Sequence, residues 1–239
     1  SLETQRNVVC EEFKQRYLNQ PYGDVWLKLR PLAYQTHPYQ WATIGQDLAQ
    51  IEHAKMEDVK AFFKKHYNPQ NAILVVGGNV KTEEVKLLAE KWFEPIPAGE
   101  KYLRNLPKEL PQTEARTLTV NANVPLNAIY VAFKMPARTD ANYQVFDLMS
   151  DILSQGQSSR LYNTLLKEQQ LFSDINAYIT SSLDEGLFVV EGKLVAGVSM
   201  ETAEKAIWVE LQKMVDSPVT ANELTKVKNK SESIVVFAE

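Results

Sequence analysis

The sequence has little cysteine, no long apolar run and no excess of positive charge, and each shortage excludes a class of protein. Cys10 is the only cysteine among 239 residues, so the chain can form neither an intrachain disulfide nor a cysteine-based zinc site. The net charge is −4, and no Lys/Arg-rich block carries interleaved aromatic residues, so we expect no nucleic-acid partner. The longest apolar runs, 72–76 and 234–238, hold about five residues, whereas a membrane-spanning helix needs about twenty. We therefore expect no transmembrane segment.

Histidine is also scarce, which limits the metal sites that the chain could build alone. No two of His37, His53 and His66 have the spacing of metal ligands on one helix. Residues 49–53 (AQIEH) would match the HxxEH zinc motif only if Ala49 were histidine. Roles in a loop or at a helix surface account better for the three histidines, since a cation suits a helix C-terminus. We expect no catalytic residue within this chain.

Three further features resemble catalytic motifs without matching them. Residues 77–82 (GGNVKT) lack the glycine that directly precedes the Lys-Thr pair of a phosphate-binding loop. Residues 156–160 (GQSSR) carry Arg160 where a serine nucleophile elbow has its second glycine. Cys10 has no His or Asp partner nearby in the sequence, so we expect it to pack as a small apolar side chain.

Helical periodicity recurs along the chain, and the strand-like runs are short. Helices are predicted at 3–18, around 25–32, at 47–66 with a break near 54–56, and at 81–93, 143–153, 159–168, 199–215 and 220–239. Strands are predicted at 72–77, 116–122 and 128–134, and as a hairpin within 174–195 that turns at 184–186. Asp47 is a predicted N-cap, and Thr220 with Glu223 forms a predicted capping box.

The pattern of elements predicts an α+β fold in two domains. Residues 94–114 hold four prolines and few apolar residues, which is typical of a linker. We therefore predict a first domain at 1–95, a linker at 96–114 and a second domain at 115–239. The second domain reads as strands, helices, strands and helices, a pattern typical of a sheet packed against helices.

Residues 5–23 (QRNVVCEEFKQRYLNQPYG) resemble a helix of the M16 (pitrilysin/insulinase-like, inverted zincin) zinc metallopeptidases. In that family the helix carries two acidic residues seven positions apart, and the second is the third zinc ligand. The resemblance places Glu12 at the metal-ligand position and Gln5 at the first acidic position, where it would hydrogen-bond the ligands and not bind the metal itself. Seven residues are two helical turns, so both side chains share one face. Glu11 is the alternative ligand.

Two later segments resemble the same family in the expected order. Residues 37–51 and 57–80 are similar to the close of the first M16 domain, and residues 156–162 (GQSSRLY) are similar to a helix start in the second. The resemblance implies two M16-type domains, each an antiparallel sheet packed with helices, the first incomplete and the second truncated in its C-terminal helix. Lys167 and Asp174 stand where the family's non-metal half has Arg and Tyr, so the chain resembles the metal-bearing N-terminal half.

The resemblance implies a fragment of a zinc-dependent endopeptidase that hydrolyses peptides in a closed clamshell chamber. The HxxEH motif would lie upstream of Glu12, so we expect Zn²⁺ in the parent protein, weak or no zinc binding here, and no activity from this chain alone. The expected partners are peptide substrates and a second M16 half, on the same chain or on another subunit. The compartment we would name is the bacterial periplasm or cell envelope.

Two alternatives stay open. Gln5 in place of an acid favours a non-catalytic M16-like scaffold or processing-partner subunit. A ligand-binding α+β module unrelated to proteolysis would require the ordered family matches to be coincidental.

Overall fold

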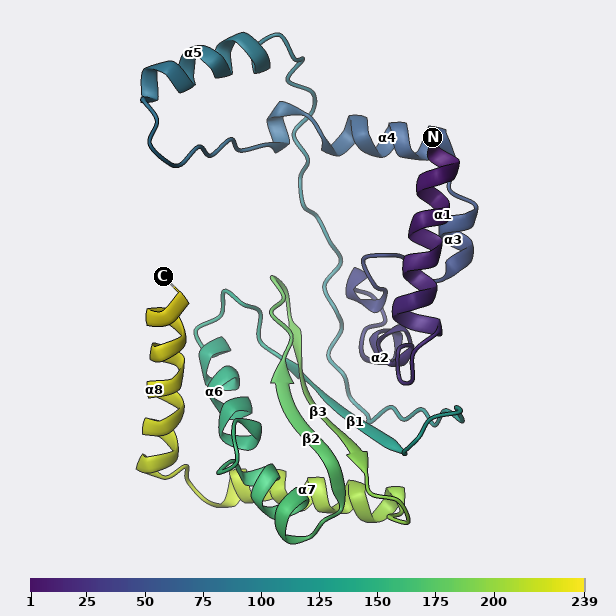
Figure 1. Ribbon diagram of the computed structural model, residues 1–239, viewed down its shortest axis with the longest axis vertical. Helices are drawn as coiled ribbons and strands as arrows, with labels where there is room; N and C mark the ends of the chain where they lie inside the picture. The colour runs from purple at the N-terminus through teal and green to yellow at the C-terminus, as the bar shows by residue number, and fades with distance from the viewer. Residues whose placement is uncertain (239) are drawn as a thin grey trace. The chain divides into compact units, whose positions relative to one another are not determined.

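A computed structural model describes residues 1–238 of the chain, which divides into two units, Ser1–Leu118 and Thr119–Glu239 (Figure 1). We call them the N-terminal unit and the C-terminal unit. The division falls just beyond the proline-containing stretch 94–114. Among residues 1–238, no helix is both long enough and apolar enough to cross a bilayer.

The described part of the N-terminal unit is built from helices and loops. The α-helices are α1 (Leu2–Phe13), α2 (Val25–Ala33), α3 (Leu48–Glu52), α4 (Met56–His66) and α5 (Thr82–Phe93), with a π-helical turn at Lys14–Leu18 and 3-10 turns at Pro38–Gln40 and Pro69–Asn71. The predicted helices and the break between α3 and α4 are confirmed. Asp47 caps α3 as predicted, since its Oδ1 accepts from the amide of Gln50 at 3.0 Å.

The core of the N-terminal unit is small. Its buried apolar residues are Cys10, Phe13, Tyr34 and Ala42, and α1 contributes the first two and packs beside α3. Cys10 is 6% exposed, which agrees with the predicted role of an apolar side chain. From residue 43 to residue 118, no described residue is buried.

The predicted strand at 72–77 is wrong for this structure. Residues 72–77 form no ladder, and the described residues of the N-terminal unit contain only an isolated bridge between Ala42 and Gly45. The predicted strand at 116–122 is also absent. A strand exists only where a neighbouring backbone pairs with it, and none of the described residues does so for either run. We call residues 72–80 the unpaired segment.

The C-terminal unit holds a three-stranded antiparallel sheet in the order β1-β3-β2. Its elements are β1 (Ala128–Met135), α6 (Tyr143–Ser154), a π-helical turn (Tyr162–Glu168), β2 (Phe172–Ile179), β3 (Gly186–Leu194), α7 (Met200–Asp216) and α8 (Ala221–Ala238). The predicted strand at 128–134, the hairpin and the helices are confirmed. The π-helical character of 162–168 was not predicted.

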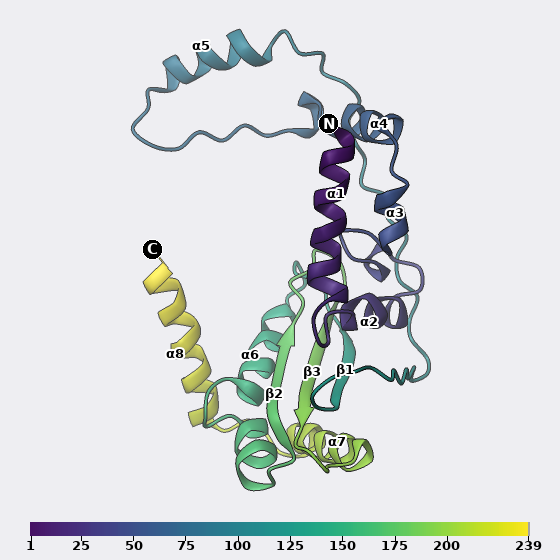
Figure 2. The same ribbon diagram turned by 45° about the vertical axis from the view of Figure 1, so that its right-hand side comes forward.

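Alternate residues of the three strands point to one face of the sheet, where α6 and α7 pack. Paired positions such as Val131 with Val190 and Phe133 with Phe188 belong to this core or pack against it. In both views α6 lies beside β2 (Figures 1 and 2). Leu153 of α6 and Ile207 of α7 are fully buried, so the helices and the sheet share one core cluster.

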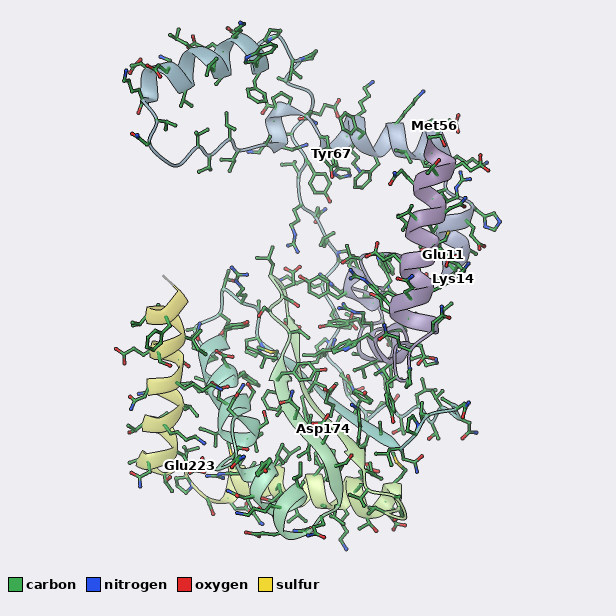
Figure 3. The ribbon with its side chains drawn as sticks, viewed as in Figure 1. Glu11, Lys14, Met56, Tyr67, Asp174 and Glu223 are labelled. Carbon is green, nitrogen blue, oxygen red and sulfur yellow. The ribbon has the colours of Figure 1, made fainter. Side chains whose placement is uncertain are left out.

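Helix α8 buries Val227 completely, and its first turn adds polar contacts to the rest of the C-terminal unit. The predicted capping box is confirmed, since the amide of Thr220 donates to Glu223 Oε2 at 2.9 Å and the amide of Glu223 donates to Thr220 Oγ1 at 3.2 Å. Arg160 donates two hydrogen bonds to Glu223, from Nε to Oε1 at 2.7 Å and from Nη2 to Oε2 at 3.0 Å. The Thr220 cap and the Arg160 pair therefore converge on one carboxylate, which lies at the start of α8 (Figure 3).

Candidate functional site

The predicted ligand Glu12 lies in the last turn of α1, and Gln5, which is predicted to hydrogen-bond the metal ligands, lies two turns earlier. Glu12 is 44% exposed as a side chain, and its Oε1 is 2.9 Å from Nη2 of Arg16 in an i,i+4 ion pair. Arg16 itself is 66% exposed, and it belongs to the π-helical turn that continues α1. An ion pair this exposed contributes about 0.5 kcal/mol or less, so the Glu12 carboxylate is available to another cation.

A shallow groove runs along the same side of α1. Its lining comes entirely from this helix and the turn after it, with the residues Glu3, Thr4, Asn7, Val8, Glu11, Glu12 and Gln15. Glu11 forms an ion pair with Lys14, in which Glu11 Oε1 lies 2.7 Å from Lys14 Nζ, and Figure 3 labels both residues. The same contact raises the pKa of Lys14. Glu12 is one of the lining residues and Gln5 is not, so the structure places these two predicted residues on one helix but only Glu12 in the groove.

The described residues do not form a zinc site by themselves. Among residues 1–238, no group of three or more His, Cys, Asp or Glu side chains is placed to hold a metal ion. A catalytic zinc site uses three protein ligands and leaves a fourth position for water. Glu12 fits the role of one such ligand, as an accessible carboxylate on a rigid helix, and the other ligands would have to come from outside the described residues.

The three histidines have surroundings that suit structural roles. His37 is 4% exposed, and its Nδ1 accepts from the amide of Tyr39 at 3.1 Å. His66, at the end of α4, has its ring centroid 4.5 Å from that of Phe62. His53 is the C-cap of α3 and is exposed.

Sequence reasoning missed Glu109, which organises the loop that contains His37. Its carboxylate accepts from three successive backbone amides, those of residues 35, 36 and 37, at 2.8, 2.9 and 2.8 Å. A carboxylate that accepts several amide hydrogen bonds fixes a loop strongly. The contact joins positions more than 70 residues apart, and no local pattern around Glu109 announces it.

In the C-terminal unit, the segment 156–162 forms a turn and anchors α8. Gly156 has a φ of +77°. Arg160 forms hydrogen bonds to Glu223, and these bonds are the main reason that the pKa of the Glu223 carboxyl is lowered to about 2. The hydrogen bond to Glu223 in turn raises the pKa of Arg160. Asp174, at a position that distinguishes the two halves of the family, lies on β2 (Figure 3) with Lys193 Nζ 3.6 Å away.

Comparison with known proteins identifies the family of this chain. The family model of the peptidase M16 inactive domain matches residues 53–231, which is more than half of the chain. The zinc protease PqqE of Helicobacter pylori is 31% identical over 227 residues, which cover 94% of this chain and 51% of that protein.

Solved structures agree with this match. The crystal structure of a protease from Helicobacter pylori has a TM-score of 0.88 at 29% identity and is matched over 98% of this chain and 57% of that one. The first half of the periplasmic protease PqqL from Escherichia coli has a TM-score of 0.68 over 99% of this chain and 51% of that one, and at 17% identity it shows a shared fold. The chain thus spans about half the length of the relatives it matches. The family model, these relatives and the α+β architecture agree, and the chain belongs to the M16 peptidase family.

Proposed function

We propose that this chain is part of a zinc-dependent endopeptidase and supplies Glu12 as one of the three protein ligands of its metal. The observation that carries the proposal is the accessible Glu12 carboxylate on α1, within a segment that resembles the ligand helix of the family. The relative PqqE, which is named a zinc protease, supports zinc as the metal. Activity, substrates and partners of the whole protein are proposed on this basis, because the chain spans about half of its relatives.

When bound, zinc polarises the scissile carbonyl and lowers the pKa of its water. Glu12 contributes an anionic oxygen held by a helix that is anchored through Phe13, which is 2% exposed. To bind a metal, Glu12 must give up Arg16, an exchange that costs little because both side chains are substantially exposed. Gln5 can hydrogen-bond within the ligand shell, but its neutral amide cannot add the negative charge of an acid there.

The remaining parts of the site are assigned to polypeptide outside this chain. Two histidines and a general-base glutamate would complete the chemistry, and a second M16 half would close a chamber around the peptide. The chain alone is then inactive, because one carboxylate cannot supply three ligands. The proposed compartment is the bacterial periplasm or cell envelope, and the similarity to PqqL, a periplasmic protease, supports this choice.

The test compares Glu12→Gln with Glu11→Gln in the full-length protein, with bound zinc measured by mass spectrometry of the purified protein. Glu12→Gln removes the anionic ligand and should lower zinc content at least tenfold and abolish peptidase activity, whereas Glu11→Gln breaks only the exposed pair with Lys14 and should leave zinc unchanged. Normal zinc stoichiometry in Glu12→Gln would refute Glu12 as a zinc ligand. Zinc loss in Glu11→Gln alone would show that Glu11 is the ligand instead.

Gln5 favours a second candidate, a non-catalytic M16-like scaffold or processing partner. The amide stands at the first acidic position of the family pattern, where a decayed site would tolerate it. A full-length wild-type protein that binds no zinc when supplied with excess metal would establish this candidate.

A further inference from the structure

The turn that follows the Glu12 helix is tight and strained. Its four residues are Gln20–Gly23, and the amide of Gly23 donates to the carbonyl of Gln20 at 3.1 Å. Pro21 stands at the first central position, which proline favours, and Tyr22 at the second has a φ of +63°. A turn of this kind requires a positive φ at the second central position, which glycine adopts freely and tyrosine does not. The glycine nevertheless stands one residue later, at position 23.

Lack of space explains why the glycine is at position 23. A β-carbon there would lie 2.8 Å from the carbonyl oxygen of Arg16, 3.0 Å from that of Tyr17 and 3.2 Å from that of Gln20. All three oxygens belong to the backbone, so none can swing aside as the end of a flexible side chain can. The turn therefore packs its own backbone directly against the end of the helix that carries Glu12, and only glycine allows this approach.

The part of the helix that Gly23 contacts is π-helical. The π-helical turn Lys14–Leu18 begins two residues after Glu12, and the amide of Asn19 donates to the carbonyl of Lys14, five residues earlier, at 2.8 Å. Turns of this kind are rare and occur frequently at functional sites. The contact from Gly23 supports the helix where its geometry departs from the α-helical form.

Ring packing connects this contact to Glu12. The Tyr17 ring lies against the Phe13 ring, with 5.2 Å between the two centroids. Phe13 is 2% exposed and directly follows Glu12 in the sequence. A displacement of the backbone at Tyr17 therefore reaches Phe13, and through Phe13 the residue that carries the proposed ligand carboxylate.

The other end of the turn is tied to α2. The amide of Val25, the first residue of α2, donates to the carbonyl of Tyr22 at 3.2 Å, and the amide of Lys28 donates to the carbonyl of Asp24 at 3.2 Å. In both views the chain leads from the end of α1 through this turn into α2 (Figures 1 and 2). Because α2 holds the turn in place, atoms added at position 23 would displace the end of α1.

We propose that Gly23 is a positioning residue of the zinc site, because the turn Gln20–Gly23 fixes the end of α1 and thereby the direction of the Glu12 carboxylate. This inference rests on the proposed function, in which Glu12 is a zinc ligand. A metal ligand must be held within about 0.5 Å of its productive position. Residues that hold ligands without touching the metal change its affinity by about tenfold to 100-fold. Gly23 thus needs neither a charge nor a contact with the metal to affect zinc binding.

The test compares Gly23→Ala with the wild type in the full-length protein. Zinc affinity is measured by competition with a chelator, and the geometry of the site is followed by the visible absorption spectrum after loading with Co²⁺. Gly23→Ala should bind zinc about tenfold more weakly, because the added methyl group displaces the end of α1 and turns the Glu12 carboxylate away from the metal. The Co²⁺ bands should shift for the same reason.

A second variant decides the question if Gly23→Ala folds poorly. Pro21→Ala adds no bulk, because it only removes the ring that fixes φ at the first central position of the turn, and Pro21 is exposed. Circular dichroism should show that this variant folds. Its zinc affinity should fall by about threefold, since a less rigid turn must be ordered when the metal binds.

Two controls separate positioning from a general loss of stability. Gly192→Ala places a β-carbon 2.6 Å from the Phe172 ring in the C-terminal unit. It should destabilise that unit but leave the zinc affinity and the Co²⁺ spectrum unchanged. Glu12→Gln should lose zinc, as the proposed function requires.

The outcomes distinguish failure of this inference from failure of the proposed function. If Glu12→Gln loses zinc while Gly23→Ala and Pro21→Ala bind it as the wild type does, the positioning role is refuted and the proposed function stands. If Glu12→Gln binds zinc normally, the proposed function fails and the positioning role fails with it. Equal loss of zinc in Gly192→Ala and Gly23→Ala would attribute both losses to stability and would also overturn the positioning role.

Discussion

The partly buried ion pair between Arg160 and Glu223 should be a main support of α8, and replacing Arg160 by methionine tests this. The side chains are 17% and 26% exposed, and two parallel hydrogen bonds join them. The pair, with the Thr220 cap, lowers the pKa of Glu223 from 4.5 to about 2. A lowering of that size corresponds to about 3 kcal/mol. Because the Thr220 bonds survive in Arg160→Met and solvent screens part of the interaction, we expect a loss of about 2 kcal/mol.

The pH dependence of this loss has a definite sign. A carboxyl whose folded pKa is depressed stabilises the folded state above its unfolded pKa, and this contribution disappears as the pH falls through the folded value. The difference between wild type and Arg160→Met should therefore be complete at pH 7, shrink below pH 4.5 and largely vanish near pH 2.

The assay is urea unfolding of the C-terminal unit followed by the fluorescence of Trp208 on α7. The other three tryptophans, Trp26, Trp41 and Trp92, are replaced by phenylalanine in all variants. For a unit of this size a loss of about 2 kcal/mol lowers the urea midpoint by about 1.5 M. Lys193→Met, which removes the exposed pair with Asp174, is the control and should lose less than about 0.5 kcal/mol. A wild-type midpoint for Arg160→Met at pH 7, or a loss of equal size at pH 2.5, would refute the reasoning.

Two smaller predictions concern the same unit, and Gly77 of the N-terminal unit serves as a comparison in the first. Gly192→Ala places a methyl group 2.6 Å from the Phe172 ring and should destabilise its unit by about 1–3 kcal/mol, whereas Gly77→Ala meets nothing within 4 Å and should change the free energy of unfolding of its own unit by less than about 0.5 kcal/mol. An unchanged free energy of unfolding in Gly192→Ala would contradict the packing. Burial raises the pKa of Asp151, so ionising it opposes folding as the pH rises, and Asp151→Asn should be more stable than the wild type at pH 7 but not at pH 3. Lower stability of Asp151→Asn at pH 7 would show that Lys226 and Lys230 outweigh burial.

The sequence was sufficient to predict elements whose causes are local. Helices follow from side chains three and four positions apart, and the Asp47 cap and the Thr220–Glu223 box are complete within four residues, so all were found. The runs 72–77 and 116–122 have the side chains of strands, yet the structure leaves both unpaired because a ladder depends on residues distant in sequence.

In the candidate site, too, residues in one local pattern could be predicted and contacts between distant residues could not. Glu12 and Gln5 were named through the family pattern on one helix, and Glu12 stays a prediction as a ligand because the described residues do not bring other ligands to it. The role of Glu109 could not be predicted, since its three amide partners lie more than 70 residues away.

Asn68 and Asn71 close the loop that carries the unpaired segment and α5, because Asn68 Nδ2 donates to the carbonyl of Glu100 and Asn71 Oδ1 accepts from the amide of Tyr102. Bringing together the ends of a flexible loop of this length costs about 3 kcal/mol of chain entropy, and these hydrogen bonds offset that cost in the folded chain. Opening them would therefore return that entropy to the loop, although none of its exposed apolar side chains would change.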